Sequence, residues 1–198
     1  MPREERTPYR SRGTSFSKHD SQREFHTECP LGVAFWQDIV EKGPRERILV
    51  LGVGNLLMGD DGVGVHAVRE LAKRTLPPGV DVVDGGTAGL DLLRLIEGYA
   101  KVLIIDAVDA GEEPGAILRF TPEDITTQAV DFAVSLHQTE VLKVLELATC
   151  VGQSLPPTVV YGVQLKEMSW STELSPAVQA QLNSLVEAVL EEVSERGQ

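Results

Sequence analysis

Apolar residues after position 46 fall into short, nearly continuous runs of five to eight residues, a length typical of β-strands rather than helices. In three of these runs consecutive residues are apolar, as expected for strands that are buried on both faces of a sheet. The predicted strands cover residues 47–53, 80–84, 101–108, 115–120 and 158–164.

Segments with helical spacing separate these strands. Residues 63–74 place Val65, Val68 and Ala72 on one face, residues 90–98 are mostly leucine and isoleucine, and residues 139–148 align Val141, Leu145 and Ala148. The last helix is marked most clearly, because Ser175 can cap its first turn and Pro176 suits its first position. Its predicted apolar stripe consists of Val178, Leu182, Leu185, Val189 and Val193.

This alternation predicts an α/β fold, in the form of a single three-layer α/β/α domain with a mostly parallel five-stranded sheet. Residues 121–138 have weak periodicity, and we expect a long loop with at most a helical turn. Residues 1–46 are polar and show no sustained period. We interpret them as an N-terminal arm, a flexible extension in which residues 32–42 could dock as a short helix, and residues 47–198 as the domain.

Charge and cysteine content narrow the functional classes. The chain has 198 residues and a net charge of -12, and residues 47–198 carry all of that charge because acidic and basic residues are equal in number before them. A surface for nucleic acid is therefore not expected. Cys29 and Cys150 lie far apart, which favours a reducing compartment. With no membrane span or signal peptide evident, we expect a cytoplasmic monomer.

The stretch LGVGNLLMGDDGVG, residues 51–64, follows the first predicted strand and resembles a nucleotide-binding turn. A dinucleotide fingerprint requires G-x-G-x-x-G, whereas the third glycine here comes two positions late. A phosphate-binding loop would continue with Lys and Ser or Thr, whereas Asp60 and Asp61 stand there. Two carboxylates would repel a pyrophosphate, so a dinucleotide-binding oxidoreductase remains only a lesser alternative.

Acidic side chains follow the first three predicted strands. Because ligands bind beyond the carboxyl ends of parallel strands, residues from different strands could meet at that edge. The candidates are Asn55, Asp60 and Asp61; then Asp84, Gly85, Gly86 and Thr87; then Asp106 and Asp109; and His137 at the start of a later helix. Asp61, Asp106 and His137 together would suit a divalent metal such as nickel or zinc.

Each candidate also has a structural interpretation. Asp61 could cap the helix that begins near Gly62, and His137 could be a surface or capping residue. The DGGTAG segment that begins at Asp84 could simply form a tight turn. The chain has neither a G-x-S-x-G elbow nor an H-E-x-x-H pattern, so a serine nucleophile or a zincin site is not supported.

Five segments, taken together, resemble the hydrogenase maturation endopeptidases, which process the large subunit of nickel-iron hydrogenases. They are RILVLGVGNLLMGDDGVGVHAV, VDGGTAGLDLL, VLIIDAVDAG, SLHQ and the GVQ and LSPAV pair, in the family's order. The resemblance implies that Asp61, Asp106 and His137 form the metal-recognising and catalytic site. Asp84, Gly85, Gly86 and Thr87 would be a loop that contacts the substrate.

The resemblance also implies an activity and a partner. The protein would be an aspartic-type or metal-dependent endopeptidase that removes the C-terminal extension of a nickel-loaded hydrogenase large-subunit precursor. Nickel would be presented by that precursor rather than held tightly by the protease. The alternative is a non-catalytic assembly factor that senses nickel in the same precursor.

Overall fold

We describe the protein from a computed structural model, which places residues 47–127 and 140–195. The predicted N-terminal arm and His137 lie outside the described residues. None of the helices within the described ranges is long and apolar enough to cross a membrane.

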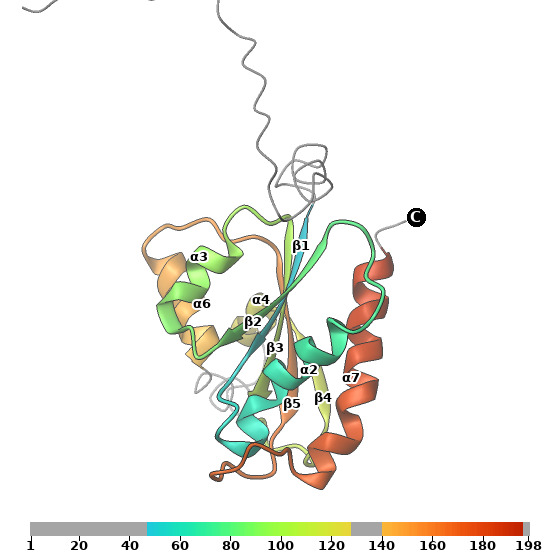
Figure 1. The fold of residues 1–198 in the computed structure, drawn as a ribbon. Helices are drawn as coiled ribbons and strands as arrows, with labels where there is room; N and C mark the ends of the chain where they lie inside the picture. The colour runs from blue at the N-terminus through green and yellow to red at the C-terminus, as the bar shows by residue number, and fades with distance from the viewer. Residues whose placement is uncertain (1–46, 128–139, 196–198) are drawn as a thin grey trace, which may run out of the picture. The chain divides into compact units, whose positions relative to one another are not determined.

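One five-stranded sheet organises the described chain, in the order β2-β1-β3-β5-β4 (Figure 1). Its strands are β1 (Ile48–Val53), β2 (Val80–Gly86), β3 (Lys101–Val108), β4 (Ile117–Phe120) and β5 (Thr158–Gln164). The first three and β5 are parallel, and β4 pairs antiparallel with β5. The predicted α/β fold with a mostly parallel five-stranded sheet is therefore confirmed.

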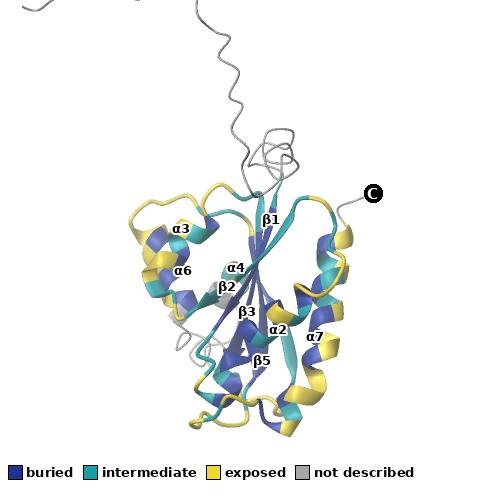
Figure 2. Ribbon diagram, viewed as in Figure 1, coloured by how far each residue is buried: buried dark blue, intermediate teal, exposed yellow. Residues whose placement is uncertain are grey.

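Helices cover both faces of this sheet (Figure 1). One face packs against α2 (Val63–Leu71) and α7 (Pro176–Ser194), and the other packs against α3 (Leu92–Ile96) and α6 (Glu140–Cys150). Alternate residues of β1 divide between the two cores: Ile48 and Val50 face α2 and α7, whereas Leu49 and Leu51 face the other pair. This two-sided burial explains why the central strands β1, β3 and β5 are mostly apolar, whereas the edge strands β2 and β4 are only partly buried (Figure 2).

The predicted helices are found in the structure, but some begin or end at other residues than predicted. Ser175 caps α7 by accepting a hydrogen bond from the Val178 N–H, and the predicted stripe of α7 is buried. The first helix ends at Leu71, so Ala72 is exposed instead of continuing the apolar face. Two short 3-10 turns, η2 (Gly59–Gly62) and η3 (Gly89–Asp91), precede α2 and α3. A short α4 (Pro122–Thr127) occupies the start of the segment expected to be a loop.

An ionic cluster fastens the end of α7 to the sheet. Glu192 accepts hydrogen bonds from Arg119 at 2.8 and 3.0 Å, pairs with Lys101, and accepts another from the Tyr161 hydroxyl at 3.1 Å. The Arg119 guanidinium, helped by the Lys101 ammonium, lowers the pKa of Glu192 to about 2. Burial and the neighbouring carboxylate raise the pKa of Tyr161 to about 12. Lys101 begins β3, and Tyr161 is in register with Ile105, so this cluster extends from the amino end of β3 to the middle of the sheet.

Candidate functional site

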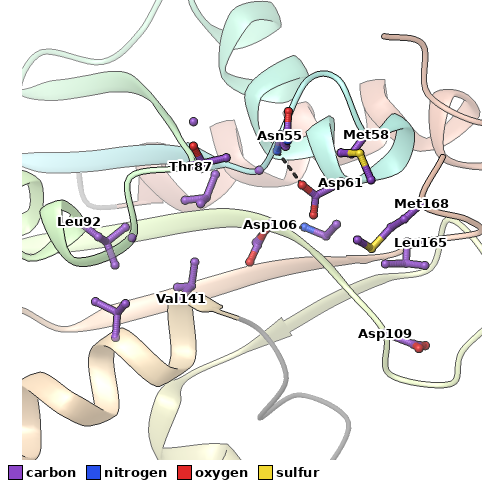
Figure 3. Close-up of a pocket in the computed structure, with 16 residues that line it drawn as sticks. Asn55, Met58, Asp61, Thr87, Leu92, Asp106, Asp109, Val141, Leu165 and Met168 are labelled. Carbon is purple, nitrogen blue, oxygen red and sulfur yellow. Dashed lines mark hydrogen bonds between the residues drawn. The ribbon is translucent and has the colours of Figure 1, made fainter. Parts of the chain in front are cut away.

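A pocket of about 580 Å³ opens at the carboxyl ends of β1 and β3, where ligands bind in open α/β sheets. Residues from β1, β2, β3 and α6 contribute to it, together with the loop that joins β5 to α7 (Figure 3). Its lining comprises Val53, Gly54, Asn55, Met58, Asp61, Gly86, Thr87, Gly89, Leu92, Asp106, Ala107, Asp109, Val141, Val144, Leu165 and Met168.

Asp61 reaches the pocket because the chain turns sharply after β1. Gly54 has a φ of 125°, and a Cβ there would lie 1.8 Å from the Asp61 carbonyl oxygen, so only glycine permits this close approach. The Asn55 N–H donates a 2.7 Å hydrogen bond to Asp61 Oδ2 and orients the carboxylate. Gly62, not Asp61, is the N-cap of α2, and no side chain caps that helix. The helix-capping interpretation of Asp61 is therefore wrong.

Asp60 performs a different task from its neighbour. It is 1% exposed and accepts three backbone hydrogen bonds: Oδ1 from Ser175 N at 2.7 Å, and Oδ2 from Lys166 N at 2.9 Å and Glu167 N at 3.3 Å. All three donors belong to the loop between β5 and α7. Asp60 therefore holds this loop against η2, and Asp61 alone of the pair faces the pocket.

Asp106 enters the pocket from β3. It is 6% exposed and lies on the face of the sheet that α3 and α6 cover, since it alternates with the residues of the opposite core. The Ala107 N–H donates to its Oδ1 at 2.9 Å. Asp61 and Asp106, far apart in the sequence, thus line one cavity, as the sequence analysis predicts.

The four residues of the DGGT segment, Asp84 to Thr87, differ in their position relative to the pocket. Gly86 and Thr87 line the pocket, whereas Asp84 and Gly85 do not. Asp84 is exposed, accepts a hydrogen bond from Gly86 N, and forms an ion pair with Arg69 of α2 at 3.1 Å. Of the four residues predicted to contact substrate, only Gly86 and Thr87 therefore lie at the pocket, and Asp84 shapes the turn beside them.

Gln164, at the end of β5, organises the remaining edge of the pocket. Its Oε1 accepts hydrogen bonds from Ala110 N at 2.8 Å and Glu112 N at 3.1 Å, and its Nε2 donates to Asp109 Oδ1 at 3.2 Å. Asp109 also lines the pocket. Gln164 was not a site candidate, although a polar residue ending a buried apolar strand is a signal that could have identified it.

The pocket is acidic in its centre and apolar on two sides. Figure 3 shows Asp61 and Asp106 between Met58, Leu165 and Met168 on one side and Leu92 and Val141 on the other. The sequence predicts Val141 only as part of an apolar helix face, and nothing local distinguishes any of these apolar residues from ordinary core residues.

The charge of the lining favours a positively charged or electrophilic ligand. Three aspartates line the pocket, and none of the described residues that line it is Lys or Arg. Residues 47–127 and 140–195 contain no group of three potential metal ligands, so the structure places two of the predicted three, and His137 is outside it. Two carboxylates can supply oxygen ligands or a general base.

Comparison with known proteins assigns the chain to a family. The family model described as HycI, hydrogenase maturation protease, matches residues 65–192. The hydrogenase expression/formation protein HupD of Bradyrhizobium diazoefficiens is 34% identical over 153 residues, which cover 76% of this chain and 80% of that protein. The hydrogenase 2 maturation protease of Escherichia coli is 33% identical over 153 residues, covering 76% and 93%.

Solved structures agree with these sequence matches. The hydrogenase maturating endopeptidase HybD from Escherichia coli is 32% identical, with a TM-score of 0.63 over 76% of this chain and 94% of that one. The [NiFe] hydrogenase maturation protease HybD from Thermococcus kodakarensis is 29% identical, with a TM-score of 0.61 over 74% and 99%. The chain therefore belongs to the hydrogenase maturation protease family.

Proposed function

We propose that this protein is a nickel-dependent endopeptidase, which removes the C-terminal extension of a nickel-iron hydrogenase large-subunit precursor after nickel insertion. The observation that carries the proposal is the convergence of Asp61 and Asp106 on one pocket at the strand ends. Membership of a protease family supports the hydrolytic activity. The names of its relatives, which are hydrogenase maturation proteases, support the partner.

In this proposal nickel arrives as part of the substrate. Nickel held by precursor thiolates can accept further oxygen or nitrogen ligands. Asp61 fits that task, because Asn55 N holds only Oδ2, and within the described chain Oδ1 accepts no hydrogen bond. A cation in this cavity would also offset the repulsion among three carboxylates that have no basic residue in the lining.

His137 is the third proposed ligand. Val141 lines the pocket and follows His137 by four residues, and four residues of chain span at most about 14 Å. The chain length therefore permits His137 to reach this cavity, and its assignment as a ligand rests on the family resemblance. An imidazole beside two carboxylates would complete a ligand set suited to nickel.

Two steps follow from this arrangement. The three side chains first bind only a precursor that carries nickel, which makes cleavage conditional on metal loading. One of the aspartates would take a proton from the water that attacks the scissile carbonyl, and would return it to the amine that leaves as the C–N bond breaks. Nickel on the precursor would supply Lewis acidity at that carbonyl. Water is the nucleophile in this scheme, which agrees with the absence of a G-x-S-x-G elbow from the sequence.

The test uses nickel-loaded and nickel-free precursor, incubated with the full-length protein and analysed by mass spectrometry. We expect loss of a C-terminal peptide only from the loaded precursor. Asp61→Asn and His137→Ala should abolish the cleavage, whereas Glu97→Gln, an exposed carboxylate outside the pocket, should not.

Other outcomes would refute parts of the proposal. Equal cleavage of both precursors would refute nickel dependence. Complex formation without any cleavage would favour the nickel-sensing assembly factor. Full activity of either the Asp61 or the His137 variant would remove that residue from the site.

A further inference from the structure

Large apolar side chains are exposed beside the acidic pocket. Trp170 is 83% exposed, Met168 56% and Leu57 54%, and all three belong to the two loops at the carboxyl ends of the strands. We call Leu57, Met58, Met168 and Trp170 the two-loop platform. Figure 2 shows the loop that leads from β5 to α7 as mainly exposed, although the sheet behind it is buried. Grouped exposed apolar residues mark interaction surfaces more often than scattered ones do.

Backbone bonds hold the two loops of the platform together. Gly59 N donates to Ser171 O at 2.8 Å, Ser171 N donates to Leu57 O at 3.1 Å, and Met58 and Ser171 form a parallel β-bridge. The buried Asp60 carboxylate adds its three backbone hydrogen bonds from the same loop. The exposed side chains therefore stand on a backbone fixed before any partner arrives, which lowers the entropic cost of binding.

The platform is continuous with the pocket. Met58 and Met168 line the pocket, and Leu57 and Trp170 lie within two residues of them in the sequence. Figure 3 shows Met58 and Met168 on the same side of Asp61. A polypeptide whose reactive part lies at Asp61 and Asp106 would therefore cross the platform as it leaves the pocket on this side.

We propose that the two-loop platform docks apolar side chains of the hydrogenase large-subunit precursor next to its scissile bond, with Trp170 as the main anchor. This inference rests on the proposed function, because it takes the same precursor as the occupant. Charge supports the choice of occupant. The acidic pocket selects a metal-bearing or basic part of the partner, and the apolar platform selects the segment that flanks it.

One other occupant is less consistent with the structure. A second copy of this chain would bring its own acidic charge against a pocket that is already acidic. A tryptophan on a fixed loop is the type of residue that dominates binding energy at protein interfaces.

The test compares Trp170→Ala and Met168→Ser with Leu147→Ala in the full-length protein. Leu147 is an equally apolar residue of α6, 48% exposed and outside the pocket lining. Binding of nickel-loaded precursor is measured by biolayer interferometry, cleavage by mass spectrometry, and folding by thermal melting. We expect Trp170→Ala to weaken precursor binding at least about tenfold and to raise KM with little change in kcat, at an unchanged melting temperature. Leu147→Ala should match the wild type.

Each alternative outcome is distinct. Unchanged binding and KM in Trp170→Ala would overturn the inference. So would a dimer in the wild type that becomes a monomer in Trp170→Ala while precursor binding is unaffected. If the wild type binds the precursor through Trp170 but never cleaves it, the proposed protease function fails while the docking surface stands.

Discussion

The two adjacent aspartates give a sharp test of the structure, because isosteric replacement of Asp60 should mainly lower stability, whereas that of Asp61 should mainly abolish activity. In Asp60→Asn, one carboxylate oxygen becomes an NH₂ group that donates hydrogen bonds. The three backbone N–H groups of Ser175, Lys166 and Glu167 point at the two original oxygens, so either orientation of the amide sets a donor against a donor. Asp61→Asn meets no such conflict, because its carbonyl oxygen can still accept from Asn55 N.

The magnitudes follow from these contacts. A hydrogen bond to a charged group contributes about 1.5–3 kcal/mol, and an unsatisfied buried donor costs about 1–3 kcal/mol. Ser175 is buried, whereas Lys166 and Glu167 are exposed residues whose N–H groups can turn to water. We therefore expect Asp60→Asn to lower the free energy of unfolding by about 2–4 kcal/mol, and Asp61→Asn by less than about 1 kcal/mol.

Thermal unfolding followed by circular dichroism would measure both effects. For a chain of this size about 1 kcal/mol shifts Tm by roughly 2–4 °C, so Asp60→Asn should melt about 5–15 °C below the wild type. Cleavage assays below the melting range should show Asp61→Asn folded but inactive. A wild-type Tm for Asp60→Asn, or a larger loss in Asp61→Asn, would refute the assignment of the structural role to Asp60.

Three further predictions concern the supports of the site and the sheet. Gly64→Ala should lower the free energy of unfolding by about 3 kcal/mol in chemical denaturation, because a Cβ there would lie 2.2 and 2.3 Å from backbone carbonyl oxygens of β3 and β1. Gly152→Ala has open space around the new Cβ and should lower it by about 1 kcal/mol. Equal losses in the two variants would contradict this reasoning. Gln164→Leu should increase amide hydrogen exchange at residues 110 and 112, because their N–H groups lose their acceptor. It should also raise KM for the precursor, because it releases Asp109. Unchanged exchange would show that Gln164 does not hold this loop. The lowered pKa of Glu192 means that its contribution to stability is fully present above pH 4.5 and is lost as pH falls toward 2. The free energy of unfolding of the wild type should therefore exceed that of Glu192→Gln by about 1–2 kcal/mol at pH 7, a value reduced by solvent screening at the half-exposed Arg119. This difference, measured by urea denaturation, should shrink as the pH falls from 4.5 toward 2. A difference that stays constant with pH would count against the ion pairs.

Local patterning was sufficient to predict the secondary structure in most of the described chain. The five strands match because each is a short run rich in apolar residues, and β1, β3 and β5 are buried along nearly their whole length. The cap and apolar stripe of α7 match because they depend on residues within one helix. The predicted first helix extends beyond the observed end of α2 at Leu71. Ala72 fits the apolar spacing, but it follows the last helical residue and is exposed.

The candidate site was predictable where residues follow strands. The alternation of strands and helices predicts that Asp61 and Asp106 share the carboxyl edge of the sheet, and the structure shows that they meet because β1 and β3 are neighbours there. His137 stays a prediction, because it lies outside the described residues. The family resemblance was confirmed by the matches to hydrogenase maturation proteases.

What the sequence by itself determined is therefore the fold class, the family and the edge of the sheet that holds the acids, since these depend on local periodicity and on motifs. Only the tertiary structure decided which aspartate of the GDD motif is buried in hydrogen bonds and which faces the pocket. The reason is that the partners of Asp60, at residues 166, 167 and 175, lie more than 100 positions away. The same long-range contacts bring the loop that carries Met168 to the pocket that Asp61 lines, where no local pattern in the sequence could have placed it.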